Sequence, residues 1–378
     1  MSFPTETFTI GVEEEYQIID PQTRHLCPDA YLILPTAQSA LGDKVVQPEF
    51  RESQIEVATP VCRSLQEVRA ELSRLRGEVI TAAATAGRQI AAAGTHPFSH
   101  WQAQTFTPKP HYLELVQNYR RLMRELVTFG CHVHIGISDR EMAIQVMNRS
   151  LSWLAPILAL SASSPFWLGS DTGYASYRTT LISRLPMAGV PQHFTSYQAY
   201  RAVVNALVTT QTIQSPAQIC WDIRLSERFP TLEFRIMDAC TTIDEAVLIT
   251  GLIRALVKTC YEQVQMNVPY TPVRSELLQA ANWRAARSGL EAELIDANHE
   301  KCVSARERIE QLLTFVRPAL QELEEWNEVY EITQKVLKHG TSAARQREIY
   351  QRTESFEKVM EFVIQETAKA TVLETALS

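Results

Sequence analysis

The arrangement of hydrophobic and polar residues predicts β-strands in the first two thirds of the chain. Residues 8–19 and 131–137 are rich in β-branched and aromatic residues, which are typical of strands. Residues 219–225 and 232–236 alternate between apolar and charged positions, which predicts a hairpin with one core face and one charged face. Further strands are expected in the second half of 49–60 and at 89–94.

Helices are predicted between these strands and throughout the last third. Three sequences with the pattern of a capping box, at 64–67, 138–141 and 242–245, each stand before a run with helical spacing of apolar residues. The second of these helices is expected to reach about residue 161, and another helix is expected at 112–127. From 243 onward the pattern predicts helices only. Strands followed by helices indicate an α+β protein with a mostly antiparallel sheet.

Composition narrows the class of protein. The chain has 378 residues, of which 45% are hydrophobic and 21% are charged, as in soluble globular proteins. A net charge of -7 argues against a general nucleic-acid binder. The seven cysteines are scattered and form no C-x-x-C pair, and the first residues do not resemble a signal peptide, so we expect a cytoplasmic protein with reduced thiols. Prolines interrupt the apolar stretch 151–168, which predicts a buried helix and no membrane span.

Three consecutive glutamates interrupt the first strand. Side chains alternate along a strand, so Glu13 and Glu15 share one face and Glu14 lies on the other. Two like charges roughly 7 Å apart repel by about 2 kcal/mol at an effective dielectric constant near 20. A hard cation such as Mg²⁺ would offset this repulsion. The alternative is a charged edge strand that faces solvent.

Other predicted strands carry charged pairs of the same kind. With the first strand they form four pairs, each on one strand face: Glu13 and Glu15, Glu52 and Glu56, His132 and His134, Glu233 and Arg235. Together they could line a concave surface that holds two or three divalent ions, Mg²⁺ or Mn²⁺ in preference to structural zinc. Such sites serve phosphoryl transfer, and a guanidinium group suits an anionic oxygen. Each pair alone could equally be solvent-facing or a cross-strand ion pair.

Several of these stretches resemble the type 2 glutamate–cysteine ligase family, whose members are also called carboxylate–amine ligases. The similar stretches are 11–17, 52–60, 92–97, 132–136, 163–178, 232–238, 283–287 and 340–342. The resemblance implies a glutamine synthetase-like fold, with a curved, mostly antiparallel sheet and helices packed on one face. It also implies one catalytic domain over 1–378, whose helical part spans roughly 243–378.

The resemblance further implies ATP-dependent ligation. The substrate carboxylate would accept the γ-phosphoryl group of ATP, and an amine would then displace phosphate from the acyl phosphate. Matching motifs imply Mg²⁺ or Mn²⁺ ligands at Glu13, Glu15, Glu52, Glu56, His132 and Glu233. They imply phosphate contacts for His134 and Arg235 and a substrate-carboxylate contact for Arg178. They also imply nucleotide contacts for Arg287 and Arg345, and further candidates at His96 and Asp171. The expected substrates are an amino-acid carboxylate and an amine, and the expected assembly is a homodimer.

Two other functions are compatible with these residues. The His132-x-His134 pair beside carboxylates is compatible with a metal-dependent amide hydrolase, although that chemistry favours histidine-rich zinc or nickel sites. A non-catalytic protein that binds a nucleotide or metabolite could use the same scaffold. However, none of the proposed metal ligands is replaced by a hydrophobic residue. The residues do not specify which amine is the acceptor.

Overall fold

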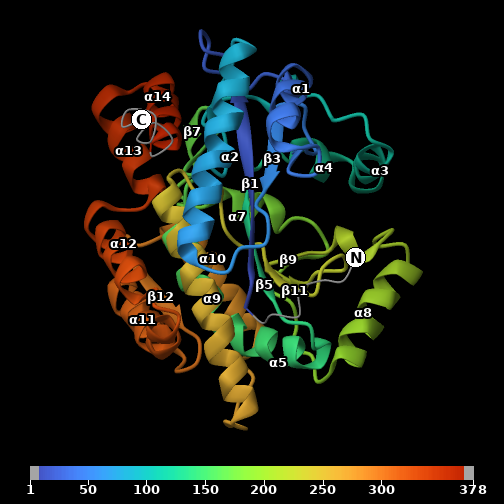
Figure 1. The fold of residues 1–378 in the computed structure, drawn as a ribbon, viewed down its shortest axis with the longest axis vertical. Coiled ribbons are helices and arrows are strands. Elements are labelled where there is room, and N and C mark those ends of the chain that lie inside the picture. The colour runs from blue at the N-terminus through green and yellow to red at the C-terminus, as the bar shows by residue number, and fades with distance from the viewer. Residues whose placement is uncertain (1–7, 370–378) are drawn as a thin grey trace.

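A computed structural model describes residues 8–369, and its centre is an antiparallel sheet (Figure 1). Each strand pairing in this seven-stranded sheet is antiparallel. The strands follow the order β10 (Ile223–Leu225), β11 (Thr231–Phe234), β5 (Cys131–Gly136), β1 (Ile10–Ile19), β3 (Gln54–Ala58) and β2 (Val46–Pro48), and β4 (Gln89–Ala91) also pairs with β1. The predicted α+β class with a mostly antiparallel sheet is therefore confirmed.

Helix starts follow the predicted capping boxes closely. The Ser64 hydroxyl accepts from the Glu67 N–H at the start of α2 (Leu65–Thr85), and Thr242 and Glu245 form a complete capping box on α9 (Ile243–Gln265). At the box predicted for 138–141, the cap of α5 (Arg140–Ser150) is Asp139, one residue later than expected. A 3-10 turn then separates α5 from α6 (Leu154–Ser161), so the single predicted helix is two.

The remaining helices surround this centre. They are α1 (Ala30–Leu41), α3 (Pro110–Tyr119), α4 (Arg121–Glu125), α7 (Tyr177–Ile182), α8 (Tyr197–Thr209), α10 (Ser275–Ser288), α11 (Ala305–Glu322), α12 (Trp326–His339), α13 (Ser342–Thr353) and α14 (Phe356–Ala368). Short strands outside the main sheet are β6 (Phe166–Trp167), β7 (Ser170–Asp171), β8 (Ala188–Gly189), β9 (Cys220–Trp221), β12 (Glu293–Asp296) and β13 (Lys301–Ser304).

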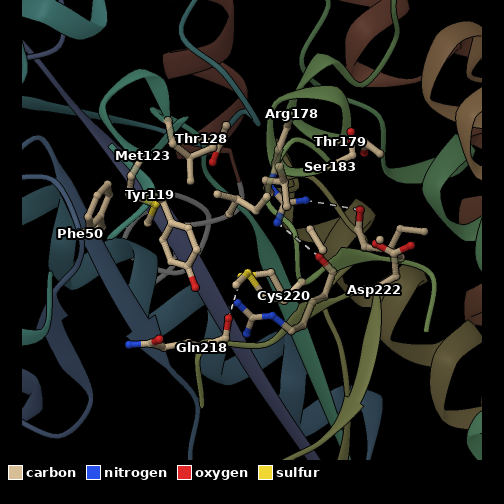
Figure 2. Close-up of a pocket in the computed structure, with 18 of the residues that line it drawn as sticks. Phe50, Tyr119, Met123, Thr128, Arg178, Thr179, Ser183, Gln218, Cys220 and Asp222 are labelled. Atoms are coloured by element: carbon tan, nitrogen blue, oxygen red, sulfur yellow. Dashed lines mark hydrogen bonds between the residues drawn. The ribbon is translucent and has the colours of Figure 1, made fainter. Parts of the chain in front are cut away.

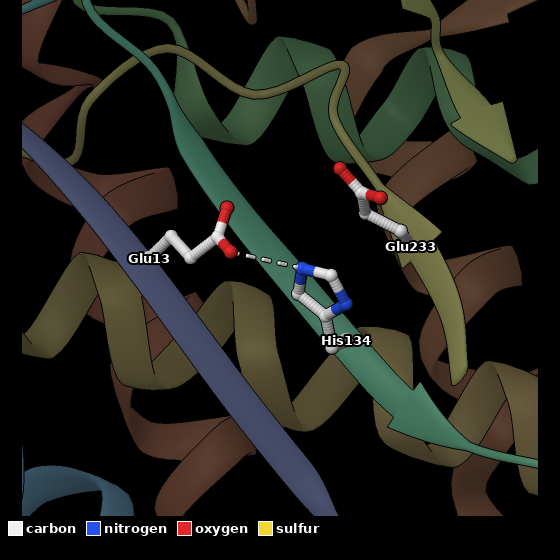
Figure 3. Close-up of side chains that lie close together, drawn as sticks. All are labelled: Glu13, His134 and Glu233. Atoms are coloured by element: carbon white, nitrogen blue, oxygen red, sulfur yellow. Dashed lines mark ion pairs between the residues drawn. The ribbon is translucent and has the colours of Figure 1, made fainter. Parts of the chain in front are cut away.

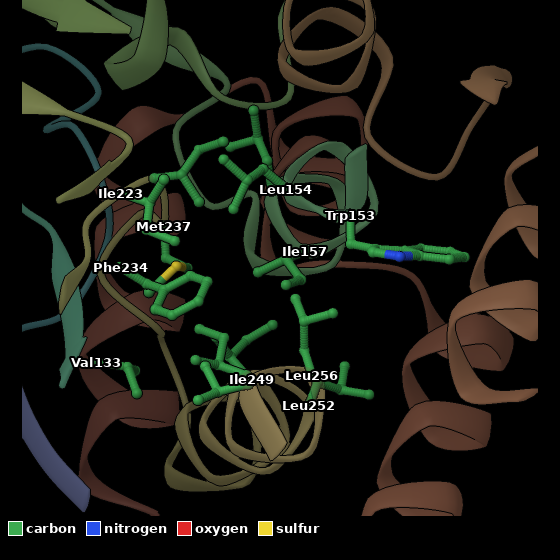
Figure 4. Close-up of a cluster of buried hydrophobic side chains, with 14 of the residues drawn as sticks. Val133, Trp153, Leu154, Ile157, Ile223, Phe234, Met237, Ile249, Leu252 and Leu256 are labelled. Carbon is green, nitrogen blue, oxygen red and sulfur yellow. The ribbon is translucent and has the colours of Figure 1, made fainter. Parts of the chain in front are cut away.

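The main hydrophobic core lies between one face of the sheet and the buried helix α9. Val133 and Phe234 point from the sheet toward Ile249 and Leu252 of α9, and Ile157 of α6 completes this layer (Figure 4). All five side chains are fully buried. Because side chains alternate along each strand, the opposite face of β1, β5 and β11 is left for polar residues.

The middle glutamate of the first strand lies on the helix-covered face, as alternation predicts. Glu14 is buried there and forms an ion pair with Arg76 of α2, whose Nε lies 2.9 Å from Glu14 Oε2. The Tyr16 hydroxyl donates to the same carboxylate. Arg76 also donates to the backbone carbonyls of Cys240 and Thr241. The pair is therefore structural, and it fastens α2 to the central strand.

Three sequence-based expectations for the elements are wrong. The region after 243 is not only helical, because β12 and β13 form a hairpin in which Leu294 and Val303 are buried. Each four-residue strand has only one buried apolar side chain, so its alternation is too short to predict. The expected helix at 112–127 breaks at Arg120, which has a φ of 51°. The expected strand at 219–225 is interrupted at Asp222.

The apolar stretch 151–168 contains the buried helix α6, as expected. Across residues 8–369, the search for a helix that combines the length and apolar character of a membrane span finds none.

Candidate active site

The strand register brings the predicted charged pairs together on the polar face of the sheet. Glu13 lies opposite His132, Glu15 opposite Glu56, and Glu233 opposite His134. Residues directly opposite in antiparallel strands share a face and lie about 5 Å apart. Four strands that are separated in the sequence therefore contribute to one polar surface.

The first group on this surface joins carboxylates to both histidines. His132 Nδ1 lies 3.0 Å from Glu13 Oε2, and His134 Nε2 lies 3.3 Å from Glu13 Oε1. Figure 3 shows Glu13 and Glu233 on either side of His134. Two sets have ligand atoms within 4.8 Å of one another: Glu13 with His134 and Glu233, and Glu13 with Glu56 and His132. Either set could hold a metal ion.

The histidines and Glu13 are electrostatically coupled. Burial, reinforced by Arg235, lowers the pKa of His132 to about 4, so this ring is neutral at physiological pH. Burial also disfavours charge on His134, but Glu13 and Glu233 outweigh this effect and raise its pKa. Burial tends to raise the pKa of Glu13, yet hydrogen bonds from both histidines hold it well below its usual value. Glu13 is therefore an ionised carboxylate.

Glu233 is fixed between two arginines. Its carboxylate lies 2.9 Å from Nε of Arg224 and also pairs with Arg235. Burial opposes ionisation, but these two guanidinium groups dominate and lower the pKa of Glu233 far below its ordinary value. Arg235 Nη1 also lies 3.5 Å from His132 Nδ1, so the positive charge of Arg235 lies between β11 and β5.

A second group consists of three carboxylates that lack such compensation. Burial, together with Glu49, raises the pKa of Glu15 to about 7. Burial followed by repulsion from Glu49, Glu13 and Glu15 raises the pKa of Glu56 well above its normal value. Burial also raises the pKa of Glu49, although the Tyr112 hydroxyl donates to it at 2.8 Å. These carboxylates would be stabilised as anions by a bound cation.

The surface fits a divalent cation. The Nε2 atom of His132 is buried and has no hydrogen-bond partner among the described residues. Unpaired buried nitrogen atoms are costly unless something binds them. Carboxylate oxygens and neutral imidazole nitrogens are suitable ligands for Mg²⁺ or Mn²⁺.

Glu49 is a residue that the sequence pattern missed. It follows β2 and precedes Phe50, outside any predicted strand pair. The prediction that Glu52 lies on a strand face with Glu56 is wrong, because Glu52 lies in a turn before β3. Its carboxylate accepts from the Thr105 hydroxyl at 2.6 Å, and it belongs to neither metal-binding set. The turn at 52–53 breaks the alternation on which its placement relied.

The polar surface opens into a cavity of about 740 Å³. Its charged lining includes Glu15, Glu49, Arg178, Asp222 and Arg235, and its apolar lining includes Phe50, Tyr119, Met123, Ile182 and Leu185. Figure 2 shows the apolar and aromatic side chains on one side of the cavity and Asp222 on the other. A volume of this size suits a small-molecule ligand.

Arg178 lies at the start of α7, directly after the loop at residues 163–176, and enters this cavity. Its backbone N–H donates to the Ser164 hydroxyl at 3.1 Å, and its guanidinium donates to the backbone carbonyls of Arg235 and Ile236. Asp238 anchors the same loop by accepting from the hydroxyls of Ser164 and Ser176, each at 2.7 Å. Buried contacts thus fix the loop, and Arg178 is held at the cavity wall.

The four further candidates lie outside the cavity. His96 is buried, and its Nε2 lies 2.9 Å from the Arg24 carbonyl, which indicates a structural role. Asp171 is exposed and pairs with Arg347. The remaining two, Arg287 and Arg345, also contact residues away from the cavity.

Arg287 and Arg345 were predicted to contact the nucleotide, and the structure does not bring either one to the polar surface. The exposed Arg287 stacks over the ring of Trp283 on α10. Arg345 pairs with Glu245 and Glu366, between α9 and α14. Both arginines were selected by resemblance in the helical third, where no strand register limits their position.

Comparison with known proteins agrees with this fold. Residues 9–362 match the family model described as glutamate-cysteine ligase family 2. A relative from Herpetosiphon aurantiacus, named as a glutamate–cysteine ligase 2, is 41% identical over 99% of this chain and 96% of its own length. One of the same name from Rhodopirellula baltica is 39% identical over 99% of this chain and 100% of its own length.

Two solved structures share the fold at low sequence identity. The glutamate–cysteine ligase of Francisella tularensis, solved in complex with AMP, has a TM-score of 0.71 at 12% identity and covers 98% of this chain and 89% of its own. A bifunctional glutathione synthetase from Pasteurella multocida has a TM-score of 0.69 at 18% identity, covering 96% of this chain and 53% of its own. These similarities confirm the predicted fold. The family match and the close relatives establish that this chain belongs to glutamate–cysteine ligase family 2.

Proposed function

We propose that this protein is an ATP-dependent carboxylate–amine ligase that forms an amide through an acyl phosphate. The observation that carries the proposal is the polar face of the sheet, where two sets of acidic and histidine side chains lie close enough to hold a metal ion. Glu15, Glu49 and His132 of this face line one cavity with Arg178 and Arg235. Family membership supports the same reaction class. The excess of carboxylates over histidines favours Mg²⁺ or Mn²⁺ over zinc.

Two sets of residues would hold the metal ions. Glu13, His134 and Glu233 form one set, Glu13, Glu56 and His132 form the other, and Glu15 and Glu49 are further carboxylates beside them. Bound divalent ions would neutralise phosphate charge and orient the transferred group. Glu15 and Glu49 are included because their buried carboxylates act on Glu56, and Glu52 belongs to neither set.

The arginines would orient the two reacting anions. Arg235 is held by Glu233, and its remaining guanidinium donors suit an oxygen of the transferred phosphoryl group. Arg178 has a buried Nε without a hydrogen-bond partner, and this donor could bind the substrate carboxylate. Orientation of the carboxylate toward the γ-phosphate is the main catalytic requirement, because phosphoryl transfer depends on positioning and charge.

The names of the relatives suggest L-glutamate and L-cysteine as the first substrates to test. ATP is proposed as the phosphoryl donor, consistent with the AMP complex of the Francisella enzyme. A cytoplasmic homodimer that takes small-molecule substrates is the expected context of this activity.

Release of ADP and phosphate from Mg-ATP tests the proposed function. The assay contains L-glutamate with and without each member of an amine panel that includes L-cysteine, and a parallel series contains EDTA. We expect release that requires a carboxylate and an amine and that EDTA abolishes. ATP consumption that is independent of every carboxylate, or activity that persists without a divalent ion, would contradict the proposal.

A further inference from the structure

Asp222 lies between two short strands at the edge of the sheet. It separates β9 from β10, and its backbone N–H donates to the Gly189 carbonyl at 2.9 Å. The backbone carbonyl of Asp222 accepts from the Arg235 N–H at 2.8 Å. This bond fixes Asp222 to the end of β11, the strand that contains Glu233. These backbone bonds fix the position of Asp222 beside the polar surface.

Among the described residues, the carboxylate of Asp222 has one hydrogen-bond donor and no ion-pair partner. Asn282 Nδ2, on α10, lies 2.9 Å from Asp222 Oδ2. Within residues 8–369 no cationic side chain forms an ion pair with Asp222, in contrast to the acids Glu13, Glu14 and Glu233. Burial raises the pKa of Asp222 to about 6, although Asn282 and the charge of Arg178 act in the opposite direction. An anion in this setting is stabilised by a cationic ligand.

This carboxylate faces the same cavity as Glu15, Glu49 and His132 of the polar surface. Glu15, His132, Arg178 and Arg235 line the cavity together with Asp222. In Figure 2 Asp222 lies on the same side of the cavity as Thr179 of α7 and Ser183, which follows α7, and Phe50 lies on the far side. A ligand with an ammonium group at Asp222 would therefore extend toward the reacting carboxylate at Arg178.

We propose that Asp222 binds the ammonium group of the acceptor amine and accepts one of its protons before amide formation. The inference rests on the proposed ligase function and deepens it, because it assigns the acceptor subsite and the class of its ligand, a primary alkylammonium ion. Asn282 is the positioning residue, since its amide fixes Oδ2 and leaves Oδ1 for the ligand.

The proton balance of this step is complete. The ammonium ion gives one proton to the Asp222 carboxylate, and the freed nitrogen lone pair attacks the carbonyl carbon of the acyl phosphate. The C–N bond forms as the C–O bond to phosphate breaks, and the second proton of the nitrogen leaves with the phosphate. Asp222 then returns its proton to solvent. General-base assistance of this kind contributes roughly 10²–10⁴-fold to a rate.

Hydroxylamine separates this role from the first half of the reaction. It is largely uncharged near neutral pH and traps acyl phosphates as hydroxamates, so it needs no proton acceptor. In Asp222→Asn we expect ATP- and glutamate-dependent hydroxamate formation close to wild type. For L-cysteine and for 2-phenylethylamine, tested separately, kcat/KM should fall about 100-fold. The control Asp43→Asn removes an exposed aspartate outside the cavity and should leave both reactions unchanged.

Three results would overturn the inference. The first is an equal loss of hydroxamate and amide formation in Asp222→Asn. The second is an increase in KM for L-glutamate in the hydroxamate assay, because Asp222 would then bind the carboxylate substrate. The third is a wild-type enzyme that reacts with hydroxylamine and with neither amine. Absence of ATP-dependent hydroxamate with any carboxylate would instead refute the proposed ligase function itself.

Discussion

Gly130 is the residue on which the geometry around Arg178 depends. A Cβ atom at this position would lie 2.5 Å from Arg178 Nη2 and 3.2 Å from His132 Nε2. Its N–H donates to Glu15 Oε2 at 2.6 Å. The missing side chain thus allows a guanidinium, an imidazole and a carboxylate to converge.

Gly130→Ala should therefore reduce activity more than stability. The methyl group would displace the flexible end of Arg178, and we expect kcat/KM for the carboxylate substrate to fall at least 10-fold, which corresponds to about 1.4 kcal/mol. The matched control is Gly11→Ala, also beside a site histidine, where the new Cβ would lie 3.5 Å from His134 Cβ in ordinary contact. Steady-state kinetics and thermal melts of both variants check this. Equal kinetics in the two variants would refute the role of Gly130.

Residue-level prediction from the sequence succeeded where alternation along a strand applies. Glu13, Glu15, His132, His134 and Glu233 lie on the same face because each occupies a strand position of the same parity. Glu49 and Asp222 lie at strand ends and breaks, where parity gives no information, and both were missed as site residues. Their buried, partly unpaired carboxylates become visible only when the fold surrounds them.

At the scale of elements, the contact between α2 and β1 supports the polar surface from behind. Arg76 and Glu14 are fully buried, and the guanidinium also binds two backbone carbonyls next to α9. Removal of one partner from a buried pair leaves an uncompensated charge, whereas an exposed pair contributes little.

We expect Arg76→Met to lower the free energy of unfolding by about 3–5 kcal/mol. The control Arg74→Met, on the same helix, breaks an exposed pair with Glu71 and should change stability by less than about 1 kcal/mol. Urea denaturation followed by circular dichroism compares the two. A loss of similar size in both variants would show that the buried pair has no special role.

Element prediction worked where local signals are strong. The capping box of Thr242 and Glu245 fixes the start of α9, and the apolar repeat carries it to its end. The break after Ser150 and the hairpin Glu293–Ser304 were not predicted, because tertiary packing determines them. Asp139 caps α5 in place of the Ser138 box, a one-residue shift between two residues with similar capping ability.

At the scale of the whole molecule, the two faces of the sheet have different roles. The face toward α9 is apolar and stabilises the fold, and the opposite face concentrates buried acids and histidines that a stability argument does not explain. The overall fold class followed from the order of strands and helices. The order of elements does not identify the substrates, and the cavity lining restricts only their charge and size.

The most direct test of the account follows the substrate oxygen. L-glutamate labelled with ¹⁸O in its side-chain carboxylate is incubated with the enzyme, Mg-ATP and the amine that supports turnover, and the released phosphate is analysed by mass spectrometry. An acyl-phosphate mechanism predicts that each phosphate carries one ¹⁸O atom, because the carboxylate oxygen leaves with it. Unlabelled phosphate formed at the rate of ADP release would contradict the account.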